Sequence, residues 1–265
     1  MVSDSVVDID SLVYTYGNMT VLDAISMSVK KGEILGILGP NGCGKTTLLK
    51  NLNRNLSPHG GCIMIDSSDI ESMSKKEIAK KVSVVPQTNE IRFAFTVRDI
   101  VGMGRIPFQD SLRGASSEDL KIIDKAMEQT GVLSMADRHI NTMSGGERQR
   151  AIIARAIAQT PEIVLMDEPT LHLDINMQFE VLDLMQKLAK DNDLTVVMVS
   201  HDLPMITRYC DRIILLHDHK IFAMGAADEV LTKENMRTVF NVDAELERDP
   251  RTGKNTVRLF GSCKE

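Results

Sequence analysis

The chain has 265 residues and a net charge of −6, and its 43% hydrophobic and 26% charged residues are ordinary for a globular protein. The acidic balance and scattered Lys and Arg argue against a nucleic-acid-binding protein, and no uncharged apolar stretch of about 18 residues could span a bilayer. The N-terminus lacks a secretory signal, and the four cysteines lack CxxC spacing, so we expect a cytosolic protein.

Strand and helix patterns alternate in the first third of the chain. In order, they predict a strand at 6–15, a buried strand at 34–38, a helix at 45–53, a strand at 62–65, a helix at 75–80 and a strand at 82–85. From about 96 to 160 the pattern becomes helical, because Thr96 and Ser116 are typical N-caps and Leu120, Ile123 and Met127 keep helical spacing. We therefore predict a helical insertion there.

The alternation returns after this insertion. It predicts a strand at 163–166, a helix at 175–189, strands at 194–199 and 212–216, and a hairpin at 243–259 that turns at 250–253. The helix should bury one face formed by Ile175, Phe179, Leu182 and Ala189. Alternating strands and helices predict an α/β fold with a mostly parallel sheet flanked by helices.

A glycine-rich segment between the second expected strand and the first helix matches the pattern GxxxxGK[ST]. In such a loop, backbone N–H groups and the N-terminus of the following helix surround phosphates. Lys45 would reach the β- and γ-phosphates, and the Thr46 hydroxyl would bind Mg²⁺. The alternative is a chance glycine-rich turn. The candidate nucleotide-binding residues of this segment are Gly39, Pro40, Asn41, Gly42, Cys43, Gly44, Lys45, Thr46 and Thr47.

Two further segments carry candidate chemistry. Asp167 and Glu168 follow an apolar strand, so their side chains point in different directions, and Asp167 could hold Mg²⁺ while Glu168 activates water as general base. The alternative is a solvated loop start. Ser144 and Glu147 have capping-box spacing around two glycines, which predicts a second anion site at a helix start. We expect a second copy of the chain to supply Ser144, Gly145 and Gly146 across an interface.

Over residues 6–240 these segments resemble a nucleotide-binding subunit of the ABC superfamily. The loop is similar to Walker A, 163–168 to Walker B, and 143–147 to the signature LSGGQ, with Met143 and Glu147 departing at its ends. The resemblance implies a P-loop NTPase core with a mostly parallel sheet, an N-terminal antiparallel β portion and the inserted helices. It also implies an ABC domain at 1–240 and a short tail at 241–265.

The same resemblance assigns further residues. Gln87 matches the Q-loop glutamine that senses Mg²⁺, Asp174 closes a D-loop, and His201 matches the switch histidine that contacts the γ-phosphate. Taken alone, His201 would be a structural histidine after a strand. Tyr16 matches the aromatic residue that stacks on adenine, although the nearby Tyr14 leaves a core role open. Cys43 occupies a variable loop position, where we expect a packing residue and leave its reactivity open.

Residues 101–108 resemble the GRxPH-like stretch of subunits that serve ferric-siderophore, haem and cobalamin importers, with Phe108 in place of His. This resemblance implies an ATPase that powers a metal-chelate importer from the cytoplasmic face of the membrane. The implied partners are Mg²⁺ with ATP, a second copy, permease subunits docked near residues 87–95 and the helical insertion, and indirectly a solute-binding protein. A non-transport ABC ATPase that switches another macromolecule is the alternative, and the sequence does not name the cargo.

Overall fold

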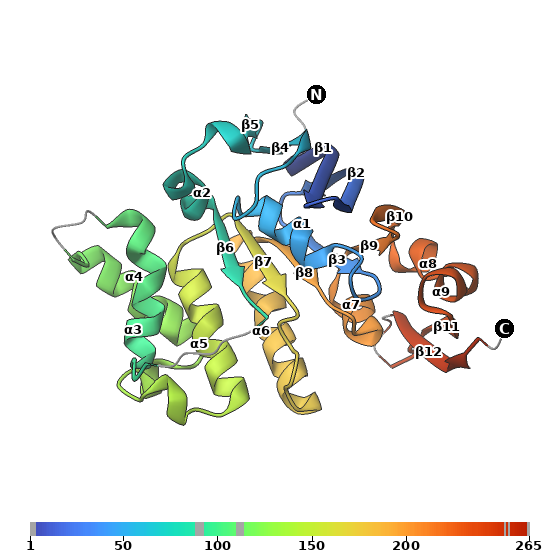
Figure 1. The fold of residues 1–265 in the computed structure, drawn as a ribbon. Coiled ribbons are helices and arrows are strands. Elements are labelled where there is room, and N and C mark those ends of the chain that lie inside the picture. Colours follow the sequence, from blue (N-terminus) through green and yellow to red (C-terminus); the bar gives the residue numbers. More distant parts are fainter. Residues whose placement is uncertain (1–3, 88–92, 110–113, 252, 254, 264–265) are drawn as a thin grey trace. The chain divides into compact units, whose positions relative to one another are not determined.

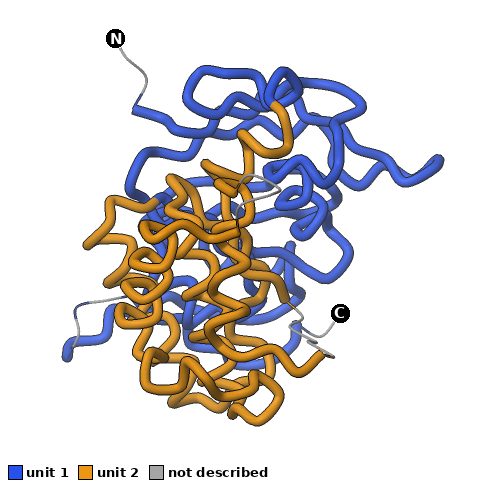
Figure 2. The backbone as a smooth tube through the Cα atoms, turned by 90° about the vertical axis from the view of Figure 1, so that its left-hand side faces the viewer, with its two compact units in different colours: residues 1–73, 195–265 blue, residues 74–194 orange. Residues whose placement is uncertain are grey.

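The computed structural model describes residues 4–87, 93–109, 114–251, 253 and 255–263 (Figure 1). The chain forms two compact units, residues 1–73 with 195–265 and residues 74–194, which Figure 2 colours separately. In the described residues, no helix combines the length and the hydropathy needed to cross a membrane.

The first unit holds most of the strands. Its elements are β1 (Ser5–Tyr16), β2 (Met19–Lys30), β3 (Ile34–Leu38), α1 (Lys45–Leu52), β4 (Gly60–Ile65), β5 (Ser68–Asp69), β8 (Thr195–Val199), α7 (Leu203–Tyr209), β9 (Arg212–His217), β10 (Lys220–Gly225), α8 (Ala227–Val230), α9 (Lys233–Phe240), β11 (Val242–Arg248) and β12 (Asn255–Ser262). β2, β1, β4 and β5 form an antiparallel sheet in that order, and β3 pairs in parallel with both β8 and β9.

The strands β2 and β10 do not appear among the elements predicted from sequence. In β2, Ala24 has a φ of 52°, so the alternation of buried and exposed residues is interrupted in mid-strand. β10 pairs antiparallel with β9 through a register shift between Ile221 and Ala223. β11 and β12 pair antiparallel, and Thr252 of the expected turn lies outside the described residues.

The second unit is mainly helical. Its elements are α2 (Lys75–Lys81), β6 (Val82–Val85), α3 (Val97–Gly102), the 3₁₀ turn Met103–Phe108, α4 (Ser117–Gln129), the 3₁₀ turns Leu133–Met135 and Ile140–Thr142, α5 (Gly145–Ala158), β7 (Ile163–Asp167) and α6 (Ile175–Asn192). β6 and β7 pair in parallel. Among the described residues from 96 to 160 there are helices and turns but no strand, as predicted.

Local helix signals are confirmed, and one predicted buried position is wrong. Thr96 caps α3 and Ser116 caps α4, each through a capping box. In α6, Leu182 and Ala189 are buried as expected, Phe179 is only half-buried, and Ile175 is 72% exposed. Ile175 lies in the first turn, before the buried part of the helix begins at Val181, so its helical spacing does not bring it to the core.

Candidate functional site

The glycine-rich loop joins β3 to α1 in the first unit. All five residues of β3 are buried, and the strand lies in parallel register with its neighbours, with Ile37 opposite Val199 and Leu38 opposite Leu215. The carboxyl ends of these strands therefore meet at one edge, which is where open α/β sheets bind ligands. His201 follows β8 at this edge with an exposed side chain.

Close backbone contacts explain two glycines of the loop. A Cβ on Gly39 would lie 2.4 Å from the carbonyl oxygen of Leu216 and 2.7 Å from Sγ of Cys43. Gly44 has a φ of 108°, and a Cβ there would lie 2.5 Å from the carbonyl oxygen of Val21. The loop is thus held between β9 and β2, too close for any side chain at these two positions.

Lys45 is the first residue of α1, and only 8% of it is exposed. Its ammonium Nζ donates to the carbonyl oxygens of Gly39 at 2.7 Å and Pro40 at 3.0 Å. Burying a cation is costly unless it is hydrogen-bonded, and these two bonds keep the charge inside the loop. Thr46 is half-buried beside it, while Asn41 and Gly42 are exposed. The loop therefore presents one positive charge and the N-terminus of α1 to a bound anion.

Two tyrosines of β1 differ in exposure. Tyr14 is 8% exposed, whereas Tyr16, the last residue of the strand, is 45% exposed. The core role that the sequence left open for Tyr16 therefore describes Tyr14 instead. Cys43 is buried against Gly39, which agrees with a packing residue.

In the second unit, the acidic pair lies at the carboxyl end of β7. Val85 of β6 is opposite Met166 of β7, so Gln87, two residues after β6, and Asp167, the last residue of β7, lie at the same edge of these parallel strands. Gln87 is exposed, whereas Asp167 and Glu168 are each only 8% exposed. A solvated loop start does not account for two nearly buried carboxylates.

Glu168 has a left-handed backbone, with a φ of 49°. That conformation is uncommon for a residue other than Gly, Asn or Asp, and it costs about 1–3 kcal/mol. It turns the chain sharply after the last strand residue, Asp167, so the two carboxylates leave the strand in different directions.

The segment predicted as a second anion site forms the N-terminus of α5. Ser144 is the N-cap, and the Glu147 carboxylate accepts from the Ser144 amide at 2.9 Å and from its hydroxyl at 3.0 Å. These two bonds, together with the nearby Arg138, lower the pKa of Glu147. Glu and Gln both close a capping box at this position, so the departure from LSGGQ at Glu147 preserves the helix start. Met143, the other departure, is buried.

The two signature glycines face the start of α6. A Cβ on Gly145 would lie 3.2 Å from Cδ2 of Leu173, and one on Gly146 would lie 2.5 Å from Sδ of Met177. Between these contacts, Asp174 is the N-cap of α6, and its exposed carboxylate does not cap the helix. The small glycines thus bring the signature and the predicted D-loop residue Asp174 together within the second unit.

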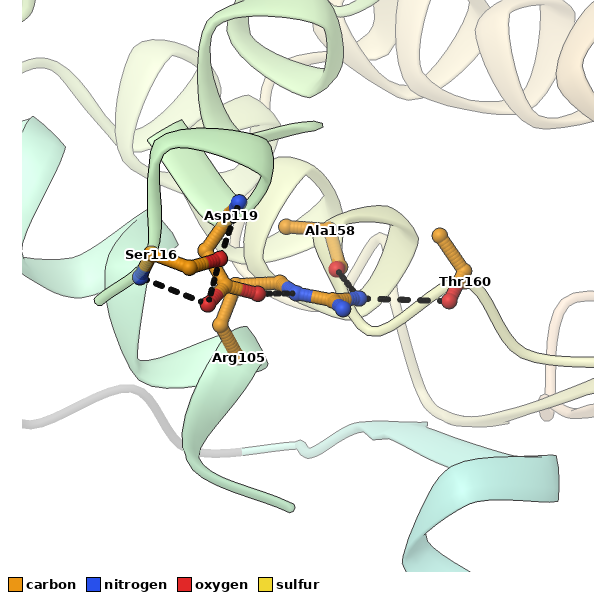
Figure 3. Close-up of polar contacts among 5 residues, drawn as sticks. All are labelled: Arg105, Ser116, Asp119, Ala158 and Thr160. Atoms are coloured by element: carbon orange, nitrogen blue, oxygen red, sulfur yellow. Dashed lines mark hydrogen bonds and ion pairs between the residues drawn. The ribbon is translucent and has the colours of Figure 1, made fainter. Parts of the chain in front are cut away.

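Arg105 of the GRxPH-like stretch is buried in an ion pair (Figure 3). Its Nε donates to Asp119 at 2.8 Å, and a terminal nitrogen donates to the Ala158 carbonyl at 2.9 Å. Its guanidinium also lies 3.9 Å from the ring centroid of Phe108. The hydrogen bond from Arg105 is the largest single cause that lowers the pKa of Asp119, ahead of either bond from Ser116. This residue therefore joins the start of α4 to the end of α5, the helix that begins at the signature.

The predicted docking segment at 87–95 is described only in part. Residues 88–92, which include Glu90 and Arg92, lie outside the described residues. Phe93 is 71% exposed, and its ring meets that of Phe95 at a centroid distance of 6.0 Å.

Comparison with known proteins identifies the family of this chain. The family model described as ABC transporter matches residues 22–171, more than half of the chain. The chain belongs to the ABC transporter family. It is an ATP-binding subunit of that family, with the α/β fold, N-terminal antiparallel sheet and helical insertion that the resemblance predicted.

The ABC subunit is similar to several curated proteins over nearly its whole length. It is 41% identical to the iron(3+)-hydroxamate import ATP-binding protein FhuC of Bacillus subtilis, covering 94% of this chain and 93% of that protein. It is 36% identical to the ferric enterobactin transport ATP-binding protein FepC of Escherichia coli, covering 95% and 93%. A solved structure assigned to the metal-chelate type of ABC transporter superposes with a TM-score of 0.85 at 28% identity, covering 97% of both chains.

Each unit thus collects part of the predicted site. The first holds the loop, His201 and the exposed Tyr16, and the second places Gln87 and Asp167 at one strand edge and the signature near Asp174. The carbonyls of Val21 and Leu216, which confine the loop, are not predicted from the sequence. A sequence pattern does not show where backbone carbonyls lie, so the glycines of the loop were the only sequence feature that could indicate a close backbone contact.

Proposed function

We propose that this ABC ATPase powers the import of a metal chelate of the ferric-siderophore, haem or cobalamin type, bound peripherally at the cytoplasmic face of the membrane. The proposal is supported by relatives whose names state import or transport of iron(3+)-hydroxamate, ferric enterobactin and cobalamin. The buried Arg105 gives the GRxPH-like stretch a structural role in the helical part of the chain. The main observation behind the proposed ATPase chemistry is that the Lys45 ammonium lies within the phosphate loop, hydrogen-bonded to two of its carbonyls.

We assign nucleotide binding first to the loop. The Lys45 ammonium would exchange its loop carbonyls for the β- and γ-phosphate oxygens, where the attraction is between opposite charges. Backbone N–H groups of residues 39–47 would surround the phosphates, and the exposed ring of Tyr16 would stack on adenine. His201 would contact the γ-phosphate.

The donor set proposed for the metal fits Mg²⁺. It consists of the Thr46 hydroxyl, the Asp167 carboxylate and the Gln87 amide oxygen, which are the hard oxygen ligands that Mg²⁺ prefers when it is held together with substrate phosphates. Within the described residues, no cluster of three or more His, Cys, Asp and Glu side chains could hold a metal by itself. When bound, Mg²⁺ would neutralise phosphate charge.

Glu168 would take a proton from the attacking water, and this step needs a carboxylate held in one direction. Its left-handed backbone and low exposure provide that restraint. In an ATP-bound homodimer, Ser144, Gly145 and Gly146 of one copy would contact the γ-phosphate bound by the other, with Asp174 beside them. The exposed Phe93 would contribute to permease docking.

Replacing Glu168 by Gln tests the proposal, because the amide keeps the size of the side chain but cannot act as a base. We expect ATP hydrolysis to fall about 10²–10⁴-fold while ATP binding persists. Glu162→Gln is the matched control, since Glu162 precedes the same strand and forms an exposed pair with Lys81. Cells that express the chain with a metal-chelate permease and its solute-binding protein should accumulate one labelled chelate, and Glu168→Gln should abolish the accumulation.

The possible outcomes separate the two parts of the proposal. Hydrolysis within a few-fold of the wild type in Glu168→Gln would show that Glu168 is not the base. If Glu168→Gln loses hydrolysis but cells with the wild-type chain accumulate no ferric siderophore, haem or cobalamin, the ATPase mechanism stands and the import of metal chelates is overturned.

A further inference from the structure

Three aromatic rings form a continuous contact at the end of β1. The ring of His59 stacks on that of Tyr14 with a centroid distance of 4.8 Å and an interplanar angle of 15°. Tyr14 in turn meets the ring of Tyr16 edge-on at 5.0 Å and 74°. Tyr14 is almost fully buried and Tyr16 is half exposed. The proposed chemistry uses only Tyr16, so His59 and its contacts are unassigned.

His59 is fixed by hydrogen bonds as well as by stacking. Its backbone N–H donates to the carbonyl of Val13 at 2.8 Å. Its ring atom Nδ1 lies 3.1 Å from the backbone nitrogen of Thr15 and 2.9 Å from the Thr15 hydroxyl. A backbone N–H can only donate, so Nδ1 acts as the acceptor.

The His59 imidazole accepts a backbone hydrogen bond of β1 at the point where pairing with β4 ends. β4 pairs with β1 as far as Gly60 opposite Val13, and the register of β1 against β2 shifts between Tyr14 and Thr15. At this irregular position, the N–H of Thr15 is satisfied by the His59 ring. His59 therefore fixes the last residues of β1, which carry Tyr16.

This end of β1 lies next to the phosphate loop. Thr15 is opposite Thr20 of β2, and the neighbouring Val21 carbonyl is the group that a Cβ on Gly44 would strike at 2.5 Å. The segment that carries His59 is itself tied to α1, because Leu56 N–H donates to the Lys50 carbonyl at 2.9 Å. His59 therefore connects α1, the helix that follows the phosphate loop, to the end of β1, which carries the exposed Tyr16 ring.

We infer that His59 is a positioning residue for the purine base: it holds Tyr16 at a set distance from the phosphate loop. The inference rests on the proposed stacking of Tyr16 on adenine. An aromatic platform binds a base well only if its ring is already ordered, since ordering it on binding would cost conformational entropy. His59 supplies this order through one stacked ring and one acceptor.

Substitutions can test separately the two contributions of His59, the Nδ1 acceptor and the ring that stacks on Tyr14. His59→Phe keeps a ring on Tyr14 but removes Nδ1, and we expect the Kd and KM for ATP to rise about three- to ten-fold, the loss typical of one hydrogen bond. The kcat at saturating ATP should stay within about two-fold, because the groups that touch the γ-phosphate are unchanged. Binding of inorganic tripolyphosphate, which has no base, should not change.

His59→Asn provides the rescue, because its amide oxygen can accept from Thr15 in place of Nδ1. We expect it to bind ATP more tightly than His59→Phe does. Tyr16→Ala is the reference for complete loss of the platform, and it should weaken ATP binding while leaving tripolyphosphate binding unchanged. Thermal unfolding of each variant shows that it is folded.

Each contrary result has a separate meaning. If His59→Phe binds ATP like the wild type while Tyr16→Ala binds it weakly, the platform exists but His59 does not position it. If His59→Phe weakens tripolyphosphate as much as ATP, His59 acts on the phosphate loop and the inference is wrong. If Tyr16→Ala binds ATP normally, the proposed stacking itself is wrong and the inference falls with it, whereas the hydrolysis test at Glu168 is unaffected.

Discussion

Cys43 shows how burial controls the chemistry of a single residue. The thiol lies inside the phosphate loop, next to Lys45, whose positive charge favours the thiolate. Burial outweighs this attraction and raises the pKa of Cys43 above its usual value. We therefore expect a protonated thiol at neutral pH that fills space against Gly39 and reacts slowly.

We expect Cys43 to be alkylated more slowly by iodoacetamide than Cys62 and Cys263, which are half-buried. Because its pKa is raised, its thiolate fraction should remain low when the pH rises from about 7 to about 9, where ordinary thiols ionise. Mass spectrometry of the cysteine peptides along this pH series measures the three rates. Modification of Cys43 ahead of the other two at neutral pH would contradict the expectation.

At the scale of elements, four helices of the second unit begin with the same device. α2, α3, α4 and α5 each carry a capping box, in which the third helical residue is a carboxylate that accepts from the N-cap residue. The hydrogen bonds lower the pKa of all four carboxylates, which are Glu77, Asp99, Asp119 and Glu147. Their contribution to stability is complete above the ordinary carboxyl pKa and is lost as the pH falls through their lowered values.

Arg105 and Arg98 allow a matched comparison of buried and exposed ion pairs in the second unit. Arg105→Met leaves Asp119 without its main partner, and we expect a loss of about 3–5 kcal/mol, as for other broken buried pairs. Arg98→Met removes an exposed pair with Asp124 and should cost about 0–1 kcal/mol. Urea unfolding of the full chain measures both. Equal losses would mean that the Arg105 pair does not hold α4 to α5.

At the scale of the whole molecule, one chain carries every motif of an ABC ATPase site. The phosphate loop opens α1 in the first unit, and the signature opens α5 in the second. We therefore expect two identical copies to form two equivalent sites, each combining Lys45 of one copy with Ser144 of the other.

Mixing two inactive chains tests this sharing. Lys45→Ala removes the phosphate-binding cation, and Ser144→Arg blocks the signature, so each homodimer should be inactive. A heterodimer keeps one site with an intact Lys45 and an intact Ser144, and an equal mixture should recover about a quarter of the wild-type ATPase rate if copies pair at random. Mixing Lys45→Ala with itself at the same total concentration is the control. A mixture as inactive as either parent would contradict shared sites.

Local sequence determined the features whose hydrogen bonds close within a few residues. The strand, loop and helix around Lys45, the capping box from Ser144 to Glu147 and the apolar strand before Asp167 were all predictable, because short-range sterics and capping specify them. The family motifs then identified the fold and the ATPase.

Tertiary structure alone decided the features that depend on residues distant in sequence. Tyr14 and Tyr16 have the same side-chain type and lie on one strand, yet Tyr14 is buried and Tyr16 is exposed, and Tyr14 stacks on His59 from the segment after α1. The partner of Arg105 and the exposure of Ile175 are likewise invisible to periodicity. Periodicity reports which face of an element can be buried, whereas the neighbours that bury it are set by long-range contacts.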